Sequence, residues 1–249
     1  MIAIRQAWEI ERIRSAGQVI AGLWKVLGPK VKPGTATSEL DKLAYDFIID
    51  NQAEPAFKGY RGYPATLCIS INHEVVHGIP RPERFLREGD LVGIDVGTSK
   101  NGYIADATRS YYVGRAPSPE ILKLLATTKQ ALELGIQSAR PGSKVSDISR
   151  AVQQAAESAG FSVVRDLCGH GVGQKLHEEP EIPNYVKSGS SPILAEGMVL
   201  AIEPMINAGG HQVKFLSDGW TVVTADSSLS AHFEDTVVVT AGQPLIVTR

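Results

Sequence analysis

Two aspartates, Asp95 and Asp106, lie in an apolar segment, where two neighbouring acids would be unfavourable unless a metal ion bound them. Residues 91–96 and 103–113 alternate or run apolar, and Lys100-Asn101-Gly102 between them supplies a turn. This pattern predicts a β-hairpin. Two carboxylates that repel one another in such an apolar hairpin need a cation between them, most simply a divalent metal held by oxygen.

Two registers of this hairpin are possible. If the turn centres on Lys100-Asn101, Asp95 faces Asp106; if it centres on Asn101-Gly102, the partner of Asp95 is residue 108. Because side chains on a strand repeat every two residues, both registers place the two carboxylates on the same face.

The chain contains an internal repeat. At an offset of 108, VKPGTATSEL matches ARPGSKVSDI, and EGDLVGID matches EGMVLAIE, which makes Glu203 the equivalent of Asp95. At an offset of 128, Asp106 matches Glu234. We therefore expect a duplicated α+β unit in which each half contributes a strand pair and each strand pair contributes two carboxylates.

A pseudo-two-fold axis between the halves would bring these four carboxylates together. Four negative charges need about two divalent ions, and two ions about 3.5 to 4 Å apart bind and activate a bridging water. The alternative, four separate surface acids, fits poorly because each acid lies in or beside an apolar strand.

The segment LCGHGVGQKLHEEP adds two histidines, His170 and His177. Its glycines are expected to let the backbone approach a ligand closely, and one of the imidazoles is expected to reach the metals. A single nitrogen ligand among oxygens suits Mn, Fe, Co or Zn in a hydrolytic pair better than a structural zinc.

The other histidines have weaker patterns. His77 in INHEVVHGIP, or His73 four residues earlier, would be able to supply a proton or a hydrogen bond to a leaving nitrogen. No ligand spacing includes His211 or His232, so we interpret these two as residues of the surface or of the layer behind the ligands.

The remaining elements must hold these side chains in place. Apolar residues spaced by three or four predict a helix over 6–27, a second helix capped by Thr37 or Ser38, and a third that begins near Glu120. Residues 67–71 predict a short apolar strand within a stretch rich in glycine, proline and aromatic residues.

Composition bounds the possible functions. The 249 residues carry a net charge of -2, with 43% hydrophobic and 21% charged residues, which is typical of a soluble globular protein and gives no support to nucleic acid or membrane as the main ligand. Cys68 and Cys168 lack CxxC spacing, so we expect two reduced, buried thiols. No signal peptide or long apolar run is visible, and the expected compartment is the cytoplasm.

Five segments carry a family resemblance: CISINHEVVHGIP, GIDVGTSKNGYIADATRS, CGHGVGQKLHEEP, VLAIEPM and DGWTVVTADSSLSAHFEDT. In order and over nearly the whole chain, they resemble the type I, bacterial-like methionine aminopeptidases, without an N-terminal zinc-finger extension. The resemblance implies the α+β pita-bread fold, with duplicated halves around a central antiparallel sheet. We expect one catalytic domain over 1–249, its repeats spanning roughly 30–115 and 138–249.

The resemblance also implies a centre of two divalent ions, Co, Mn, Fe or Zn, with five ligands. Asp95 matches a ligand of one ion, and His170 and Glu203 match ligands of the other. Asp106 and Glu234 match the two residues that bridge both ions.

Matching catalytic positions are His77 and His177, which would contact the scissile amide and the developing tetrahedral intermediate, and Glu203, which would accept a proton from the bridging water. The family's methionine pocket is matched by Tyr60, Tyr63, Cys68 and Trp220, with Phe57 and Leu176 where other members carry a Cys and a Phe.

One segment departs from the family pattern. Around the last ligand the family usually has Gln, an aromatic residue, Glu and His, whereas this chain has His232, Phe233, Glu234 and Asp235. A Glu followed by Asp is more typical of the prolidase and aminopeptidase P relatives. All five ligands are retained, and the departure concerns the residues that surround them.

The activity implied by the resemblance is removal of the initiator methionine from nascent polypeptides, by attack of a metal-bridging hydroxide on the first peptide bond. One alternative is an aminopeptidase with a different N-terminal specificity, because Phe57 and Leu176 alter the pocket; another is a non-catalytic binding module on the same fold. The expected partners are nascent N-termini and, from the resemblance alone, the ribosome, and the expected state is a monomer.

Overall fold

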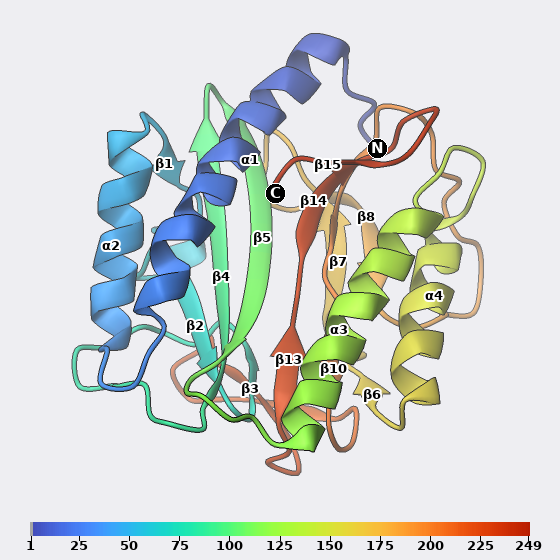
Figure 1. Cartoon of the computed structure of the whole chain (residues 1–249). Coiled ribbons are helices and arrows are strands. Elements are labelled where there is room, and N and C mark those ends of the chain that lie inside the picture. The colour runs from blue at the N-terminus through green and yellow to red at the C-terminus, as the bar shows by residue number, and fades with distance from the viewer. Residues whose placement is uncertain (1) are drawn as a thin grey trace.

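Each half of the chain folds as two helices packed on antiparallel strands. The computed structural model describes residues 2–249, and Figure 1 shows one helix pair over the strands of each half. The helices of the first half are α1 (Ala7–Leu27) and α2 (Thr37–Asp50), and those of the second are α3 (Pro119–Ser138) and α4 (Val145–Ser158). Two short 3-10 helices, η1 (Gly28–Lys30) and η2 (Tyr60–Gly62), lie in the first half.

The strands of the first half centre on a long hairpin. Strand β4 (Leu91–Lys100) pairs on one edge with β5 (Tyr103–Tyr112) and on the other with β1 (Glu54–Pro55) and β2 (Leu67–Ile71). A separate small sheet joins β3 (Glu74–Val76) to β12 (Val222–Thr224) and β11 (Val213–Phe215).

The strands of the second half form two antiparallel sheets. The larger has the order β15 (Leu245–Ile246), β14 (Asp235–Val238), β9 (Val199–Ile202), β7 (Cys168–Gly171) and β8 (Glu178–Pro183). The smaller has the order β13 (Ser230–His232), β10 (Met205–Asn207) and β6 (Ser162–Val163).

The β4–β5 hairpin adopts the second of the two predicted registers. Asp95 pairs with Thr108, and Asp106 pairs with Gly97. The turn residues Asn101 and Gly102 have φ of 54° and 79°, and two positive values are what a two-residue type I′ turn requires. Both aspartates therefore lie on one face of the hairpin, as either register demanded.

The two halves repeat one another in detail. Helices α2 and α4 start and end 108 positions apart, and the bridges Ala36–Phe85 and Lys144–Ile193 keep the same offset. Before each helix a glycine with positive φ donates its N–H to an equivalent carbonyl, Gly34 to Leu86 and Gly142 to Leu194. The halves meet where Thr108 and Glu234 form a β-bridge between β5 and the residue that precedes β14.

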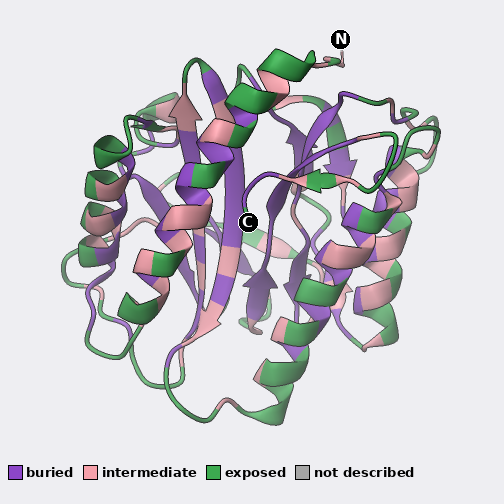
Figure 2. Ribbon diagram, turned by 45° about the horizontal axis from the view of Figure 1, so that its top comes forward, coloured by how far each residue is buried: buried purple, intermediate pink, exposed green. Residues whose placement is uncertain are grey.

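The core lies between the helices and the strands. Figure 2 shows buried residues along the strands and on the inner helix faces, with exposed residues on the outer faces. In α1 the inner face is formed by Ile13, Ile20 and Leu23, all fully buried, as the spacing of three or four residues predicts. Among the described residues, no helix has both the length and the apolar character needed to cross a membrane.

Two expectations from the sequence need correction. Neither Thr37 nor Ser38 caps α2, because the N-cap residue is Ala36, and the Thr37 hydroxyl instead donates to the Arg81 carbonyl at 3.0 Å and accepts from the Arg81 N–H at 2.9 Å. The hydroxyl thus ties the helix to a distant loop. Of the two free thiols, Cys68 is buried as predicted, but Cys168 is only half-buried.

Candidate metal centre

All the candidate residues line one cavity of about 200 Å³. The five candidate ligands, the two candidate catalytic histidines and the six candidate pocket residues contribute to its wall. The sequence did not point to Arg61, which also lines the cavity and is exposed. His73 is exposed and His211 is half-buried, and neither is among the lining residues.

The four carboxylates reach the cavity from both halves. Asp95 and Asp106 come from the shared face of the β4–β5 hairpin, and Glu203 directly follows β9. Glu234 comes from the bridge between the halves, where its N–H donates to the Thr108 carbonyl at 3.0 Å. The repeat in the sequence therefore corresponds to convergence in space.

His170 is oriented toward these carboxylates by a backbone contact. Its Nδ1 lies 2.9 Å from the Gly171 carbonyl, so Nδ1 donates and the lone pair of Nε2 is left free. Nε2 lies 3.5 Å from Glu203 Oε1 and 3.9 Å from Asp106 Oδ2. One ligand atom each from Asp106, His170 and Glu234 fall within 4.8 Å of one another, a separation that an ion between them can span.

Several carboxylate oxygens here lack the partners that buried oxygens normally have. Asp95 Oδ1, Asp106 Oδ1 and Glu234 Oε1 are buried and accept no hydrogen bond from any described residue. Buried polar atoms are nearly always satisfied, so three orphaned oxygens around one cavity call for a cation. Carboxylate oxygens with one imidazole nitrogen form a donor set that fits divalent metals.

Electrostatics lead to the same conclusion. Burial raises the pKa of Asp95 to about 7. Burial and the charges of neighbouring carboxylates raise the pKa values of Asp106, Glu203 and Glu234 well above their usual range. Four acids that oppose one another's ionisation are stabilised as carboxylates only when positive charge is supplied.

The two candidate catalytic histidines both line the cavity. His177 places Nδ1 2.9 Å from the Tyr60 hydroxyl, and its ring centroid is 4.3 Å from that of His170. His77 has φ of 61°, a conformation that is rare outside glycine and that recurs at functional sites. Burial, with His177 nearby, lowers the pKa of His77 to about 4, so it is neutral at pH 7.

The pocket residues form a compact apolar group beside the carboxylates. Phe57, Tyr63, Cys68 and Leu176 are buried and pack together with Tyr60 and Trp220. A wider groove of about 700 Å³ adjoins the cavity and shares Arg61, His170 and His177 with it. The site is therefore narrow and apolar on one side of the carboxylates and open on the other.

The glycines around His170 have a different role from the one predicted. A Cβ on Gly169 would lie 2.4 Å from the Ala201 carbonyl oxygen, and one on Gly171 would lie 2.2 Å from the Glu179 carbonyl oxygen. A Cβ on Gly173 would meet the Arg5 guanidinium at 2.4 Å. The glycines accommodate neighbouring protein groups, chiefly the strands on either side of β7, rather than a ligand.

His232 lies behind the carboxylates. It is 3% exposed, and its Nε2 is 3.8 Å from Glu203 Oε2, so of the two positions allowed by the sequence the structure selects the inner one. Thr108 was not predicted as a site residue, yet its hydroxyl donates to Glu234 Oε2 at 3.0 Å. In the sequence, the one sign that Thr108 belongs to the site is the hairpin register that pairs it with Asp95.

Comparison with known proteins places this site in a family. The family model described as metallopeptidase family M24 matches residues 11–241. A methionine aminopeptidase of Clostridium acetobutylicum is 47% identical over 248 residues, covering 100% of this chain and 99% of that protein.

Solved structures agree. The crystal structure of methionine aminopeptidase from Thermotoga maritima superposes with a TM-score of 0.97 at 40% identity, with full coverage of both chains. Prolidase from Pyrococcus furiosus matches with a TM-score of 0.80 at 25% identity, over 99% of this chain and 65% of that one. The predicted pita-bread fold is thus confirmed, and the chain belongs to metallopeptidase family M24 and, within it, to the type I methionine aminopeptidases.

Proposed function

We propose that this chain is the hydrolase that removes the N-terminal methionine from nascent polypeptides. The observation that carries the proposal is the composition of one small cavity, in which a cluster of four carboxylates and an imidazole adjoins a group of apolar side chains. The family membership and the names of full-length relatives support the same activity.

The five candidate ligands would hold two divalent ions, Co, Mn, Fe or Zn. As the family resemblance implies, Asp95 would bind one ion, His170 and Glu203 would bind the other, and Asp106 and Glu234 would bind both. When bound, such ions lower the pKa of a coordinated water and polarise the carbonyl of the scissile bond. The orphaned oxygens of Asp95, Asp106 and Glu234 support this assignment.

Three residues of the chain would accept or donate protons and hydrogen bonds during the reaction. Glu203, whose side chain is 13% exposed, would accept the proton of the attacking water. His77 is neutral at pH 7 and can offer its N–H to the scissile nitrogen, and His177, positioned by Tyr60, can donate to the developing oxyanion.

The apolar group beside the carboxylates would hold the methionine side chain. Aromatic rings and the Cys68 sulfur suit a flexible thioether, and the buried Phe57 and Leu176 would fix the depth of the pocket. The pocket admits one side chain, whereas the adjoining groove leaves room for the rest of the peptide. This asymmetry favours cleavage at a chain end rather than within a chain.

The activity is tested by methionine release from Met-Ala-Ser. Chelator-stripped protein is titrated separately with Mn, Co, Fe and Zn, and we expect metal-dependent release that is absent with the N-acetylated peptide. A panel of Met-Ala, Leu-Ala and Ala-Pro peptides tests the pocket. Preferred cleavage of Leu-Ala would indicate the altered-specificity alternative, and binding of metal without any cleavage would indicate the non-catalytic one.

We further propose how the chain is organised and where it acts. A single catalytic domain over 1–249, with repeats of roughly 30–115 and 138–249, is supported by the matching helices and glycine turns of the two halves. Nascent chain ends at the ribosome in the cytoplasm would supply the substrate, and the chain would work as a monomer.

A further inference from the structure

Asp235 is a fully buried carboxylate directly behind the metal centre. Adjacent residues of an extended segment point to opposite sides, so Glu234 enters the cavity while Asp235 enters the core. Asp235 Oδ1 accepts from Arg109 Nη2 at 2.6 Å and from the Thr248 hydroxyl at 2.7 Å. Its Oδ2 accepts from Arg249 Nε at 2.8 Å and contacts Arg249 Nη2 at 2.7 Å.

Arg109 extends this network to Glu234. Its Nη1 donates to the Glu234 carbonyl at 2.5 Å and to the Thr108 carbonyl at 2.9 Å, while Nη2 is held by Asp235. Thr108 in turn donates its hydroxyl to Glu234 Oε2 at 3.0 Å. Both the backbone and the carboxylate of Glu234 are thus held by Arg109 and its direct neighbour.

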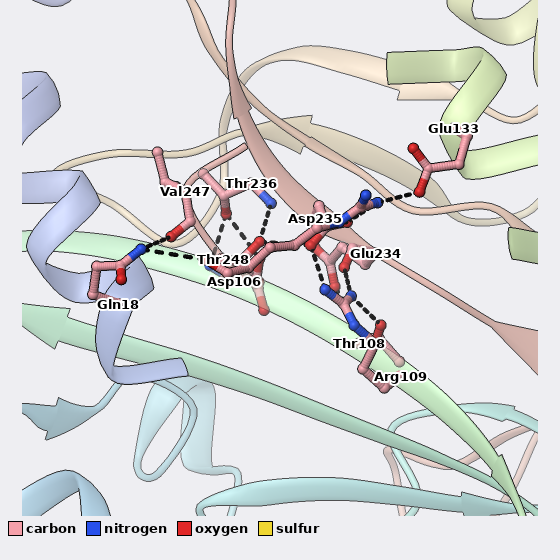
Figure 3. A network of polar contacts seen from close by, with 11 residues as sticks. Gln18, Asp106, Thr108, Arg109, Glu133, Glu234, Asp235, Thr236, Val247 and Thr248 are labelled. Carbon is pink, nitrogen blue, oxygen red and sulfur yellow. Dashed lines mark hydrogen bonds and ion pairs between the residues drawn. The ribbon is translucent and has the colours of Figure 1, made fainter. Parts of the chain in front are cut away.

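Thr248 extends the network to Asp106. The Thr236 N–H donates to the Thr248 hydroxyl at 3.3 Å, and the Thr236 hydroxyl accepts from the Asp106 N–H at 2.9 Å and donates to the Asp106 carbonyl at 2.8 Å. The Val247 N–H donates to the Thr236 carbonyl at 3.0 Å, and Gln18 of α1 contacts the Val247 carbonyl (Figure 3).

Apart from the candidate ligands Asp106 and Glu234, the charges of the network balance. Arg109 and Arg249 are the cations, Asp235 and Glu133 are the anions, and Arg249 Nη2 lies 2.5 Å from Glu133 Oε1 on α3. Asp235 is fully buried, whereas the Arg249 side chain is 38% exposed. Removing Arg249 would leave the buried carboxylate with Arg109 as its remaining arginine partner, and we expect that pair to shift. Because Arg109 also donates to the Glu234 carbonyl, such a change would be transmitted to Glu234.

We propose that Arg249 is a positioning residue for the metal centre. Through Asp235 and Arg109 it holds the backbone carbonyl of Glu234, and the neighbouring Thr248 holds the backbone of Asp106 through Thr236, so both ligands are positioned through their main chain. Asp235, which stands where the family usually has a histidine, links Arg109 to Arg249 because its carboxylate binds both arginines. This inference rests on the proposed ligand assignment.

The test is metal affinity, measured by calorimetry with Mn and Co on chelator-stripped full-length protein. Arg249→Met should weaken binding about 10- to 100-fold, the usual effect of losing a residue that orients ligands. Arg249→Lys should weaken it less, because a lysine keeps the charge without the planar fork. The control is Arg140→Met, which removes an exposed arginine bonded to Gln243 and Gln137 and should leave affinity unchanged.

A spectroscopic readout separates positioning from general loss of stability. The visible absorption of the cobalt-loaded protein reports ligand geometry, and we expect it to shift in Arg249→Met at a temperature where circular dichroism shows a folded chain. Asp235→Asn combined with Arg249→Met should weaken metal binding by less than the product of the single effects, because both act through one network.

Wild-type affinity and an unchanged cobalt spectrum in folded Arg249→Met would overturn the inference. Should that variant not fold, Arg249→Lys and Thr248→Val would decide the question by the same two readouts. Glu234→Gln separates this inference from the proposed function: unaltered affinity in Glu234→Gln would reject the ligand assignment itself, whereas loss of affinity there with none in the Arg249 variants would reject only the positioning role.

Discussion

Asp106 is a buried acid that is expected to bind metal but that destabilises the metal-free protein. It is 4% exposed, lies near Glu234, Asp95 and Glu203, and has one carboxylate oxygen without a partner among the described residues. Burial and these charges raise its pKa, which means that its ionised form destabilises the metal-free fold. The same charge is what makes the residue a ligand, so function and stability are opposed at this position.

Replacing Asp106 by Asn should therefore abolish peptidase activity and stabilise the metal-free protein. An amide keeps the size of the side chain but removes the negative charge that an ion needs. We expect the melting temperature in EDTA to rise by about 2–4 °C, the equivalent of roughly 1 kcal/mol in a chain of this size. Added metal should no longer raise the melting temperature, as scanning calorimetry with and without Mn would show.

Wild-type turnover with full metal content in Asp106→Asn would contradict the ligand role. A melting temperature in EDTA below that of the wild type would contradict the electrostatic argument, even if activity were lost.

At this scale the sequence revealed the acids but not their supports. Local periodicity alone places Asp95 and Asp106 on one face, because strand geometry fixes which side chains share a side. No local pattern joins Arg109 to Asp235, 126 positions away, so the network behind the ligands could not have been predicted. Asp235 was noticed only as a departure from the family pattern.

Strand β7 shows how an element positions a ligand. It lies between β8 and β9, and His170 at its centre reaches the carboxylates only because the glycines beside it let these strands approach. The spacing of the glycines was visible in the sequence, but their role depends on which strands become neighbours. That information lies in the tertiary structure, and the sequence alone therefore predicts contact with a ligand instead.

Gly171→Ala should weaken both the fold and metal binding. Its Cβ would lie 2.2 Å from the Glu179 carbonyl oxygen, so β7 and β8 must separate, at a cost of about 1–3 kcal/mol, and His170 must move with them. Gly242→Ala is the matched control, because a Cβ there would meet nothing within 4 Å. Urea unfolding and metal titration should change in the first variant and not in the second; equal behaviour of the two would reject the argument.

Helix α3 allows a prediction that concerns stability alone. The Ser118 hydroxyl caps this helix by accepting from the Ile121 N–H at 3.3 Å, and neither residue is among those that line the cavity. Ser118→Ala should lower the free energy of unfolding by about 1 kcal/mol and leave the rate of methionine release unchanged. A change in metal affinity in this variant would show that α3 is coupled to the site more tightly than its cap suggests.

For the whole molecule, buried titratable groups determine how stability depends on pH. Burial raises the pKa of Asp95 to about 7, so the folded state keeps a proton that the unfolded state loses near pH 4. Burial lowers the pKa of His170 and of His232 to about 3, so the folded state lacks protons that the unfolded state holds below about pH 6.5. These effects oppose each other between about pH 4 and pH 6.5. Above pH 6.5 the histidines of the unfolded state are neutral too, so the effect of the acids with raised pKa remains.

The metal-free protein should therefore become less stable as the pH rises from about 6.5 to 8, by roughly 1.4 kcal/mol per pH unit for each acid that keeps its proton in the folded state. Asp95 contributes to this slope only up to about pH 7. Urea unfolding in EDTA at half-unit pH steps would measure this slope. Saturating metal holds the carboxylates ionised in the folded state, so it should remove or reverse the slope. A metal-free protein whose stability rises over this range would contradict the assignment of raised pKa values.

Much of the overall architecture could be predicted from the sequence because the chain contains an internal repeat. The matches between EGDLVGID and EGMVLAIE, and between the two Pro-Gly helix starts, implied two equivalent halves whose carboxylates meet. The sequence could not show how the halves are joined. The junction between the halves is formed by the pairing of Thr108 with Glu234 and by the contacts of Thr248 and Arg249 with Asp235. The first of these joins residues far apart in the sequence.

Because the carboxylates lie between the two halves of the chain, metal binding also affects how long the protein survives in a cell. An ion shared by Asp106 and Glu234 would join the two halves of the chain, and at 100 times its dissociation constant it would add about 2.7 kcal/mol to the stability of the fold. Differences of that size change how much of a protein escapes proteolysis. Metal scarcity would therefore act on the number of copies that survive as well as on the rate at which each one works.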